Sequence, residues 1–364
     1  MAAQLTHIGA YGIIDFASLR GMVRDRRCSD MRWMIFALAV ASLAVGSAYS
    51  DWKIIRQDDF IRNDGIEGDL LFVKALDADT VVAAGGNGLI LRSTDGGKTW
   101  SAKNIKMDEM GVIFWGGFFL NSEIGYVVGV GSRGFRGMAL IYRTNDGGNS
   151  WKGSQIRAAR LIDAFFINEK RGWAVGETRT FLKTSDGGES WELLSSERAR
   201  AGEMRYNYNA IWFNTSKSGW IVGAYGIIMH TEDGGESWKQ VPIEDVISDL
   251  NDVFFLNEKE GWIVGQDGTA LHTSDGGRSW KLISMPKDVS DYGLRAVYFV
   301  TPSMGWVVGD SGLILETKDG GKSWLKVKPL TNSVLTDVSG FRDEKAGKIV
   351  CYAVGEWGIV LKTE

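Results

Sequence analysis

Six near-identical octapeptides recur along the sequence and constrain its fold more than any other feature. Each reads S/T-x-D-G-G-x-S/T-W, from STDGGKTW ending at Trp100 to TKDGGKSW ending at Trp324. We call each octapeptide a box, and the tryptophans that end successive boxes are 40 to 51 residues apart. Internal repeats of about 40–50 residues, each holding several short strands, are typical of β-propellers. The spacing therefore predicts one repetitive all-β domain.

A second motif, G-W/Y-x-V-G, recurs upstream of the boxes. Looser copies at Val81 (VVAAG) and Cys351 (CYAVG) extend the series to seven. The full copies begin at Gly125, Gly172, Gly219, Gly261 and Gly305. Alternating apolar residues and many β-branched or aromatic residues indicate strands. Each unit then reads as four strands, with the G-W/Y-x-V-G strand second and the box between the third and the fourth.

The box residues match the demands of a tight turn, so we interpret them as structural. An aspartate accepts backbone N–H groups across the turn, the two glycines adopt positive φ, and the tryptophan packs between blades. The predicted structural residues are Asp95, Asp146, Asp186, Asp233, Asp275, Asp319, Trp100, Trp151, Trp191, Trp238, Trp280 and Trp324.

The two ends of the repeat region set the number of blades at seven. The last unit stops at Glu364, before a box or a fourth strand. Asp51–Ile55 (DWKII) resembles the fourth strands that follow other boxes, and Trp52 precedes Trp100 by 48 residues. We predict that the last blade takes one strand from the N-terminus and three from the C-terminus. Such closure removes exposed sheet edges.

Composition excludes several classes of function. The net charge is −4 with mixed signs, which gives no reason to expect nucleic acid as a partner. Cys28 and Cys351 are far apart and no Cys/His cluster has metal-ligand spacing, so we expect no disulfide, no metal and no cofactor.

The N-terminal region reads as an export signal. Residues 33–50 form an uncharged, mostly apolar run that follows four arginines and precedes Asp51. This pattern predicts a signal peptide within 31–50, cleaved before Asp51, with retention as a membrane anchor as the alternative. Residues 1–30 form an extension without a fold argument, because translation can also start at Met22 or Met31. The propeller is assigned to 51–364.

With D-G-G-x-S-W boxes and G-W-x-V-G strands in register, the chain resembles the photosystem II assembly and stability factor family. The resemblance covers the whole predicted mature chain. It implies a seven-bladed propeller without catalytic activity that binds a protein partner, with a membrane complex as a candidate. Cyanobacterial members resemble lipoproteins with a cysteine at the cleavage site, whereas Ser50-Asp51 stand there in this chain.

Such boxes, known as Asp-boxes, also occur in sialidases and xyloglucan-cleaving glycosidases. The sialidase signature Phe-Arg-Ile-Pro is missing, the nearest string being GFRG at 134–137, and seven blades exceed the six of that family. His230 and His272 occupy a repeat position that holds Glu316 in another blade. We expect that position to face solvent. We therefore predict no catalytic residue, and a secreted glycan-binding or glycan-cleaving propeller is the alternative.

Arginines concentrate in segments predicted to lie on the face opposite the boxes. Because Arg suits bidentate ion pairs at interfaces, they predict a protein-binding site beside Tyr206, Tyr208 and Phe135. The candidates are Arg133, Arg136, Arg157, Arg160, Arg179, Arg198, Arg200 and Arg205. The other side of the same face carries Asp267, Asp288, Asp291, Asp310 and Glu356. A solvated rim with locally paired charges is the competing interpretation.

The sequence thus predicts an exported, monomeric binding and assembly scaffold. Its location would be the periplasm, the thylakoid lumen or the extracellular space, with a possible tether through 33–50. The identity of the partner is not encoded in any motif.

Overall fold

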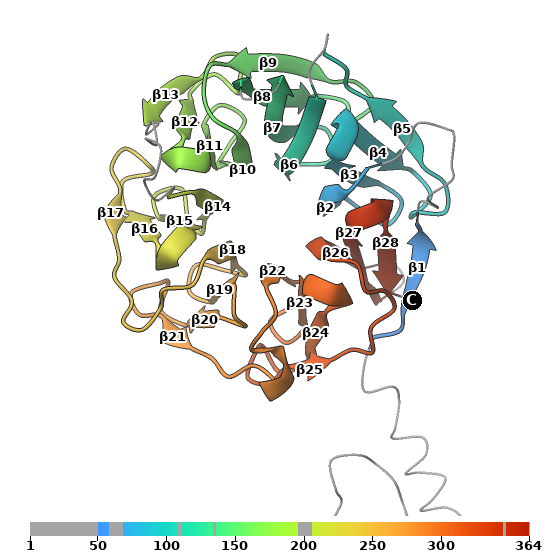
Figure 1. Cartoon of the computed structure of the whole chain (residues 1–364), viewed down its shortest axis with the longest axis vertical. Coiled ribbons are helices and arrows are strands. Elements are labelled where there is room, and N and C mark those ends of the chain that lie inside the picture. Colours follow the sequence, from blue (N-terminus) through green and yellow to red (C-terminus); the bar gives the residue numbers. More distant parts are fainter. Residues whose placement is uncertain are drawn as a thin grey trace, which may run out of the picture. The chain divides into compact units, whose positions relative to one another are not determined.

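The computed structural model describes residues 50–57, 68–107, 111–133, 136–195, 206–344 and 347–363, without the side chains of 132–136. These residues form seven four-stranded antiparallel sheets arranged as blades around a common axis (Figure 1). They lie within one compact unit, 49–364. No described helix is long and apolar enough to cross a membrane. The predicted signal segment and the extension before it lie outside the described residues, apart from Ser50.

Blades 1 to 6 each consist of four consecutive strands, with the first strand innermost. Blade 1 holds β2 (Leu70–Ala75), β3 (Val81–Gly85), β4 (Leu89–Ser93) and β5 (Ser101–Asn104). Blade 2 holds β6 (Gly111–Phe119), β7 (Gly125–Arg133), β8 (Arg136–Thr144) and β9 (Lys152–Ile156). Blade 3 holds β10 (Leu161–Phe166), β11 (Gly172–Gly176), β12 (Phe181–Thr184) and β13 (Glu192–Ser195).

The next three blades repeat this order with shorter outer strands. Blade 4 holds β14 (Tyr208–Phe213), β15 (Gly219–Gly223), β16 (Ile228–Thr231) and β17 (Lys239–Gln240). Blade 5 holds β18 (Leu250–Phe255), β19 (Gly261–Gly265), β20 (Ala270–Thr273) and β21 (Lys281–Leu282). Blade 6 holds β22 (Leu294–Phe299), β23 (Gly305–Gly309), β24 (Ile314–Thr317) and β25 (Leu325–Lys326).

Blade 7 closes the ring as predicted. Its strand order is β1 (Trp52–Arg56), β28 (Val360–Thr363), β27 (Lys348–Gly355) and β26 (Leu335–Asp343). Trp52 pairs with Thr363 and Ile54 with Leu361, so the N-terminal strand hydrogen-bonds directly to the last strand of the chain. The all-β, seven-bladed prediction and its mode of closure are both confirmed.

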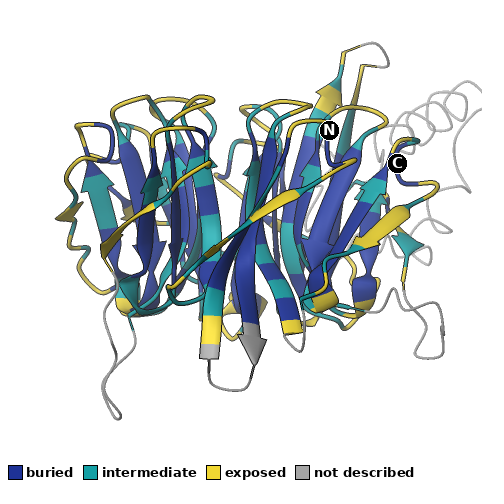
Figure 2. Cartoon of the chain, turned by 90° about the horizontal axis from the view of Figure 1, so that it is seen from above, coloured by how far each residue is buried: buried dark blue, intermediate teal, exposed yellow. Residues whose placement is uncertain are grey.

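The core lies between blades, because each sheet buries both faces against its neighbours. Five of the seven second strands, β3, β11, β15, β19 and β23, are buried along their whole length. Figure 2 shows this burial in the inner strands, with exposed residues on the outer strands and in the turns at both faces. Strands buried on both sides require continuous apolar sequence, which explains the V-V, I-V and A-V pairs in the motif.

The ring has two faces, which we name by their turns. The box face carries the Asp-boxes between third and fourth strands. The connection face carries the turns between second and third strands and the links from blade to blade. Five of these turns are the short 3₁₀ helices η1 (Gly86–Gly88), η2 (Glu177–Arg179), η3 (Ala224–Gly226), η5 (Asp310–Gly312) and η6 (Glu356–Gly358).

Each Asp-box is a hydrogen-bonded turn, and blade 5 illustrates it. Asp275 Oδ1 accepts the Ser279 backbone N–H at 2.9 Å, while Oδ2 accepts the Ser279 hydroxyl at 2.7 Å. Gly277 N–H donates to Thr273 Oγ1 at 2.8 Å. Trp280 packs edge-on against Trp220 of blade 4, with ring centroids 5.6 Å apart. These contacts satisfy the turn internally and join two blades.

One sequence expectation is wrong. The position before each box, to which Lys362 corresponds in blade 7, was expected to face solvent but is half-buried in six blades and fully buried in blade 6, where Glu316 is 0% exposed. Strand pairing places it directly beside the second residue of the G-W/Y-x-V-G strand, as in the pairs Trp306–Glu316 and Trp220–His230. The large neighbouring side chain covers it.

Candidate functional site on the connection face

The connection-face turn of blade 3 departs from the pattern of the other blades. In blades 1, 4, 5, 6 and 7 a residue at positive φ is followed by a glycine at φ between 62° and 71°. Blade 3 places Thr178 and Arg179 there, both at φ 53°. The left-handed region costs a non-glycine residue about 1–2 kcal/mol. Backbone strain of this kind concentrates at functional sites, which draws attention to Arg179.

Arg179 is held against an aromatic pair. Its guanidinium carbon lies 4.5 Å from the centroid of the Tyr206 ring. Tyr206 in turn meets Tyr225 of η3 edge-on, with centroids 5.5 Å apart. The Arg179 N–H also donates to the Tyr206 carbonyl at 2.9 Å. Arg179, Tyr206 and Tyr225 thus form a continuous row of contacting side chains from blade 3 to blade 4.

A second cation–aromatic contact lies at the start of blade 3. The Arg160 guanidinium stacks over Trp115 of β6 at 4.2 Å and forms an ion pair with Glu177. Arg157, three residues earlier in the link from blade 2, is exposed and makes no hydrogen bond or ion pair with the described part of the chain. Stacking on aromatic faces fixes the orientation of Arg160 and leaves Arg157 available to a partner.

Exposed apolar side chains extend this row toward blade 5. Tyr225 is 47% exposed and Ile247, in the link between blades 4 and 5, is 82% exposed. The Gly226 N–H donates to the Ser248 carbonyl at 3.0 Å, which brings this link against η3. Arginines and apolar side chains therefore share one stretch of the connection face, as they do at protein interfaces.

The structure places only part of the predicted arginine set. Arg157, Arg160 and Arg179 lie on the connection face. Arg133 and Arg136 pair with each other at the end of the β7–β8 hairpin, but their side chains are not described. Arg198, Arg200 and Arg205, with Phe135, lie outside the described residues. Sequence reasoning missed Trp115, because no repeat position marks it and its partner is 45 residues away.

The acidic half of the same face is largely engaged in local contacts. Asp310 pairs with Arg295 at 2.8 Å, and Asp288 with Lys326 at 2.9 Å. Glu356 accepts the Val334 backbone N–H at 3.1 Å. Asp267 accepts the Ser248 hydroxyl at 2.8 Å, and Asp291 that of Ser290 at 3.3 Å. The local-pairing interpretation therefore describes the acidic half better than the arginine half.

Three carboxylates occupy one position of the innermost strands. Each accepts its own following backbone N–H and one from the next blade, as when Asp163 bonds Ala164 at 2.8 Å and Ile211 at 2.9 Å. Asp252 bonds Val297, and Asp337 bonds Val73, in the same way. Desolvation by burial raises the pKa of these carboxyls to about 8, 6 and 7 respectively.

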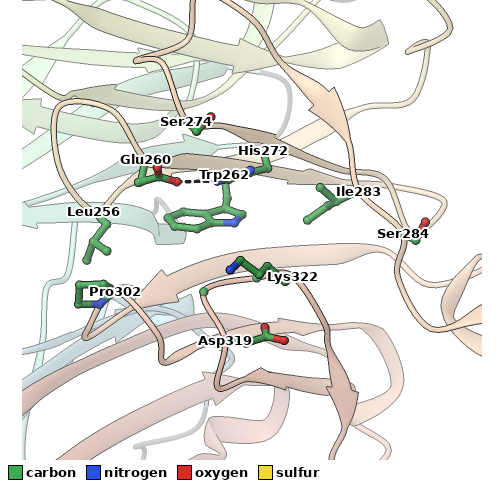
Figure 3. A pocket seen from close by; sticks show the side chains of 12 residues that line it. Leu256, Glu260, Trp262, His272, Ser274, Ile283, Ser284, Pro302, Asp319 and Lys322 are labelled. Atoms are coloured by element: carbon green, nitrogen blue, oxygen red, sulfur yellow. Dashed lines mark hydrogen bonds and ion pairs between the residues drawn. The ribbon is translucent and has the colours of Figure 1, made fainter.

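One pocket of about 680 Å³ opens on the box face between blades 5 and 6 (Figure 3). Glu260 and His272 point toward each other above Trp262, with 2.8 Å between Oε2 and Nε2. Asp319, on the opposite wall, accepts the Ser323 hydroxyl within its own box at 2.6 Å. Glu260 and His272 thus bond to each other and Asp319 bonds within its box, so these three groups carry no assigned chemistry.

Comparison with known proteins agrees with this architecture. The family model described as photosynthesis system II assembly factor YCF48 matches residues 149–248 and 242–337, which together span just over half of the chain. A model of the BNR/Asp-box repeat matches residues 91–102. No curated protein matches.

Solved structures with the same fold include relatives and enzymes. A structure of YCF48 bound to a D1 peptide is 20% identical, covering 86% of this chain and 97% of that one, with a TM-score of 0.63. YCF48 from Cyanidioschyzon merolae is 17% identical, covering 87% and 99%, with a TM-score of 0.63. A xyloglucanase from Xanthomonas campestris is 13% identical, covering 85% and 53%, with a TM-score of 0.63. These likenesses extend to the fold, whereas the family model matches the sequence itself, and on that match the chain belongs to the photosynthesis system II assembly factor YCF48 family.

Proposed function

We propose that this protein is an exported, non-enzymatic assembly scaffold that holds an acidic segment of a membrane-complex protein on its connection face. The observation that carries the proposal is the pair of arginines stacked on aromatic rings, Arg160 and the backbone-strained Arg179. Family membership supports the assembly role, and the structure of a relative with a D1 peptide supports a peptide as the bound species.

The chemistry of the face favours an acidic, partly apolar partner. Guanidinium groups bind carboxylates bidentately, and Arg157 is exposed without a partner among the described residues. Tyr225 and Ile247 offer apolar surface beside them. A segment with one or two carboxylates followed by a bulky apolar side chain would match this order.

Affinity capture from membranes of the native host tests the proposal. The bait proteins are the wild-type chain, the variant Arg157→Glu/Arg160→Glu, and the control Arg278→Glu/Lys322→Glu, which makes the same charge change on the box face. We expect subunits of one membrane complex with the wild type and the control, and their loss with the connection-face variant. Equal capture by all three would remove the connection face from the proposal.

A glycoside hydrolase is the second candidate, and the observation that favours it is the set of carboxylates with raised pKa on the innermost strands. Against it, Asp163, Asp252 and Asp337 use both oxygens for backbone N–H groups. Such bonds tie the carboxylates to the ring rather than to a substrate. Release of reducing sugar from xyloglucan that is lost in Asp163→Asn would establish the enzyme; no release supports the scaffold.

A further inference from the structure

The position before each box carries a cation or a histidine in every blade except blade 6. The residues are Arg92, Arg143, Lys183, His230, His272 and Lys362, against Glu316 in blade 6. Four of these side chains reach an acceptor in the box of the next blade. Arg92 Nε bonds the Gly147 carbonyl at 2.9 Å and Lys362 Nζ bonds the Gly96 carbonyl at 2.7 Å. Arg143 and Lys183 pair with the box glutamates Glu189 and Glu236.

Blade 6 has no such acceptor in front of it. In the next blade, blade 7, the outer strand is β1. This strand follows the N-terminal entry of the chain and not a box. The group that lies there is a donor, the backbone N–H of Ser50, and Glu316 Oε2 accepts it at 2.9 Å. The same oxygen accepts the Trp306 indole N–H at 3.1 Å. The change from cation to anion thus follows from a change of neighbour from acceptor to donor.

The surroundings of Glu316 supply one cation and two neutral donors. Its side chain is 0% exposed. Oε1 has no hydrogen bond, and the nearest cation is Lys318 Nζ, half-exposed at 3.2 Å from it. One half-exposed lysine and two neutral donors hold this carboxylate and leave Oε1 without a hydrogen bond, whereas buried charges are normally paired and fully hydrogen-bonded.

We propose that Glu316 is the binding site for the α-ammonium group of a processed chain that begins at Ser50. Hydrolysis of the Tyr49–Ser50 peptide bond consumes one water and leaves a carboxylate on Tyr49 and an ammonium on Ser50. That ammonium stands where the amide N–H now lies, 2.9 Å from Oε2, and brings a positive charge and further donors. It clamps the start of β1 to blade 6 and so locks the ring closure.

This site moves the expected cut by one residue. Cleavage before Asp51, predicted from the small residues Ala48 and Ser50, would remove the donor that Glu316 holds. Cleavage before Ser50 preserves it and places Tyr49 directly before the cut, where a signal peptidase requires a small residue, so we assign this cut to a different protease. The ring itself is complete in either product, because all seven sheets lie between Trp52 and Thr363.

A two-by-two comparison of melting temperatures tests the site. The full chain and a chain released from a removable leader to begin at Ser50 are each prepared with Glu316 and with Glu316→Gln. The Gln oxygen still accepts an amide N–H but offers no charge to an ammonium. We expect Glu316→Gln to lower the melting temperature of the Ser50 chain by on the order of 10 °C and that of the full chain by much less. An equal drop in both chains overturns the proposal.

Two further measurements keep the test independent of how well the variant folds. The matched control Glu344→Gln removes an exposed carboxylate paired with Arg342, and both chains should tolerate it. In the wild-type Ser50 chain, the α-amine should react at least tenfold more slowly with an acylating reagent than in Glu316→Ala. Mass spectrometry of the protein from its host should give Ser50 as the first residue, and any other first residue contradicts the proposed processing.

Discussion

The two faces of the ring differ in how closely they follow the repeat. On the box face, every blade from 1 to 6 satisfies its turn with the same bonds, as Asp275 and Thr273 do in blade 5. On the connection face, the residue at positive φ is Asn87, Tyr225 or Trp357 in different blades, and in blade 3 a second non-glycine, Arg179, follows it. What is repeated holds the ring together. Where a blade departs from the repeat, as blade 3 does at Arg179, its residues have a role other than holding the ring together.

The largest effect should come from filling a box glycine. At Gly277 φ is +85° and an added Cβ would lie 2.1 Å from Cζ2 of Trp220. We expect Gly277→Ala to lower the unfolding free energy by about 3–5 kcal/mol, since backbone strain and overpacking act together. Denaturant titration measures this. Gly347, at φ +66° with open space around it, is the matched control, and Gly347→Ala should cost only about 1 kcal/mol.

If both glycine variants lost the same stability, packing between box and blade would not distinguish the box face from any other turn.

The innermost carboxylates should give stability a pH dependence of their own. The folded pKa of Asp163 is raised to about 8 by desolvation, well above its unfolded value. The stabilising contribution of Asp163 to the unfolding free energy is therefore fully present below about pH 4 and is lost as the pH rises toward 8. Because the side chain is only half-buried, we expect Asp163→Asn to remove roughly 1–2 kcal/mol of the fall in unfolding free energy between pH 5 and pH 8. An unchanged slope would show that Asp163 is ionised throughout.

On the connection face, binding and stability should separate. Arg157→Glu changes an exposed side chain, so we expect a melting temperature within about 1–2 °C of the wild type and a roughly tenfold loss of partner affinity. Titration calorimetry with the captured partner measures the affinity. Arg278→Glu on the box face should leave it unchanged. A matching loss in both variants would point to net charge rather than to the connection face.

Arg179→Gly tests whether the strain in blade 3 serves binding. Glycine adopts φ 53° without the steric cost, but the substitution also removes the stacking on Tyr206. These effects oppose each other, so we expect stability unchanged or raised by up to about 1 kcal/mol, with affinity for the partner reduced several-fold. A clear loss of stability without loss of affinity would make Arg179 a structural residue.

The smallest effect concerns the box aspartates at low pH. Hydrogen bonds from Ser150 lower the pKa of Asp146 to about 2. Its contribution is present above about pH 4 and is lost as the pH falls toward 2, opposite in sign to that of Asp163. The stability gap between wild type and Asp146→Asn should therefore be small at pH 7 and close by pH 2. A gap that persists at pH 2 would mean that shape, and not charge, matters in the box.

The repeated parts of the molecule could be predicted from sequence, because a repeat tests the same physical demand several times. Six boxes and seven second strands fix the all-β ring, and the match of Trp52 to the other fourth strands fixes its closure. Glu316 shows where prediction from the repeat fails. Aligned with cations, it looked like a variable exposed position, and its burial follows from the chain entry at Ser50, which only the closed ring places beside it.

The binding face shows the same limit for a different reason. The sequence identifies Arg160 and Arg179 as charged residues of this face. Their stacking on Trp115 and Tyr206 depends on the links between blades, and these links do not follow the repeat. The role of Asp163, Asp252 and Asp337 likewise becomes clear only in the folded ring, where the next blade supplies a backbone N–H to each of them.

Hydrogen–deuterium exchange of the wild-type protein, alone and saturated with its captured partner, tests the central claim most directly. The account predicts slower exchange in the connection-face segments 157–160, 177–180, 206–209 and 224–227, with the six Asp-box turns unchanged. Protection confined to the Asp-box turns, or to the pocket between blades 5 and 6, would contradict it.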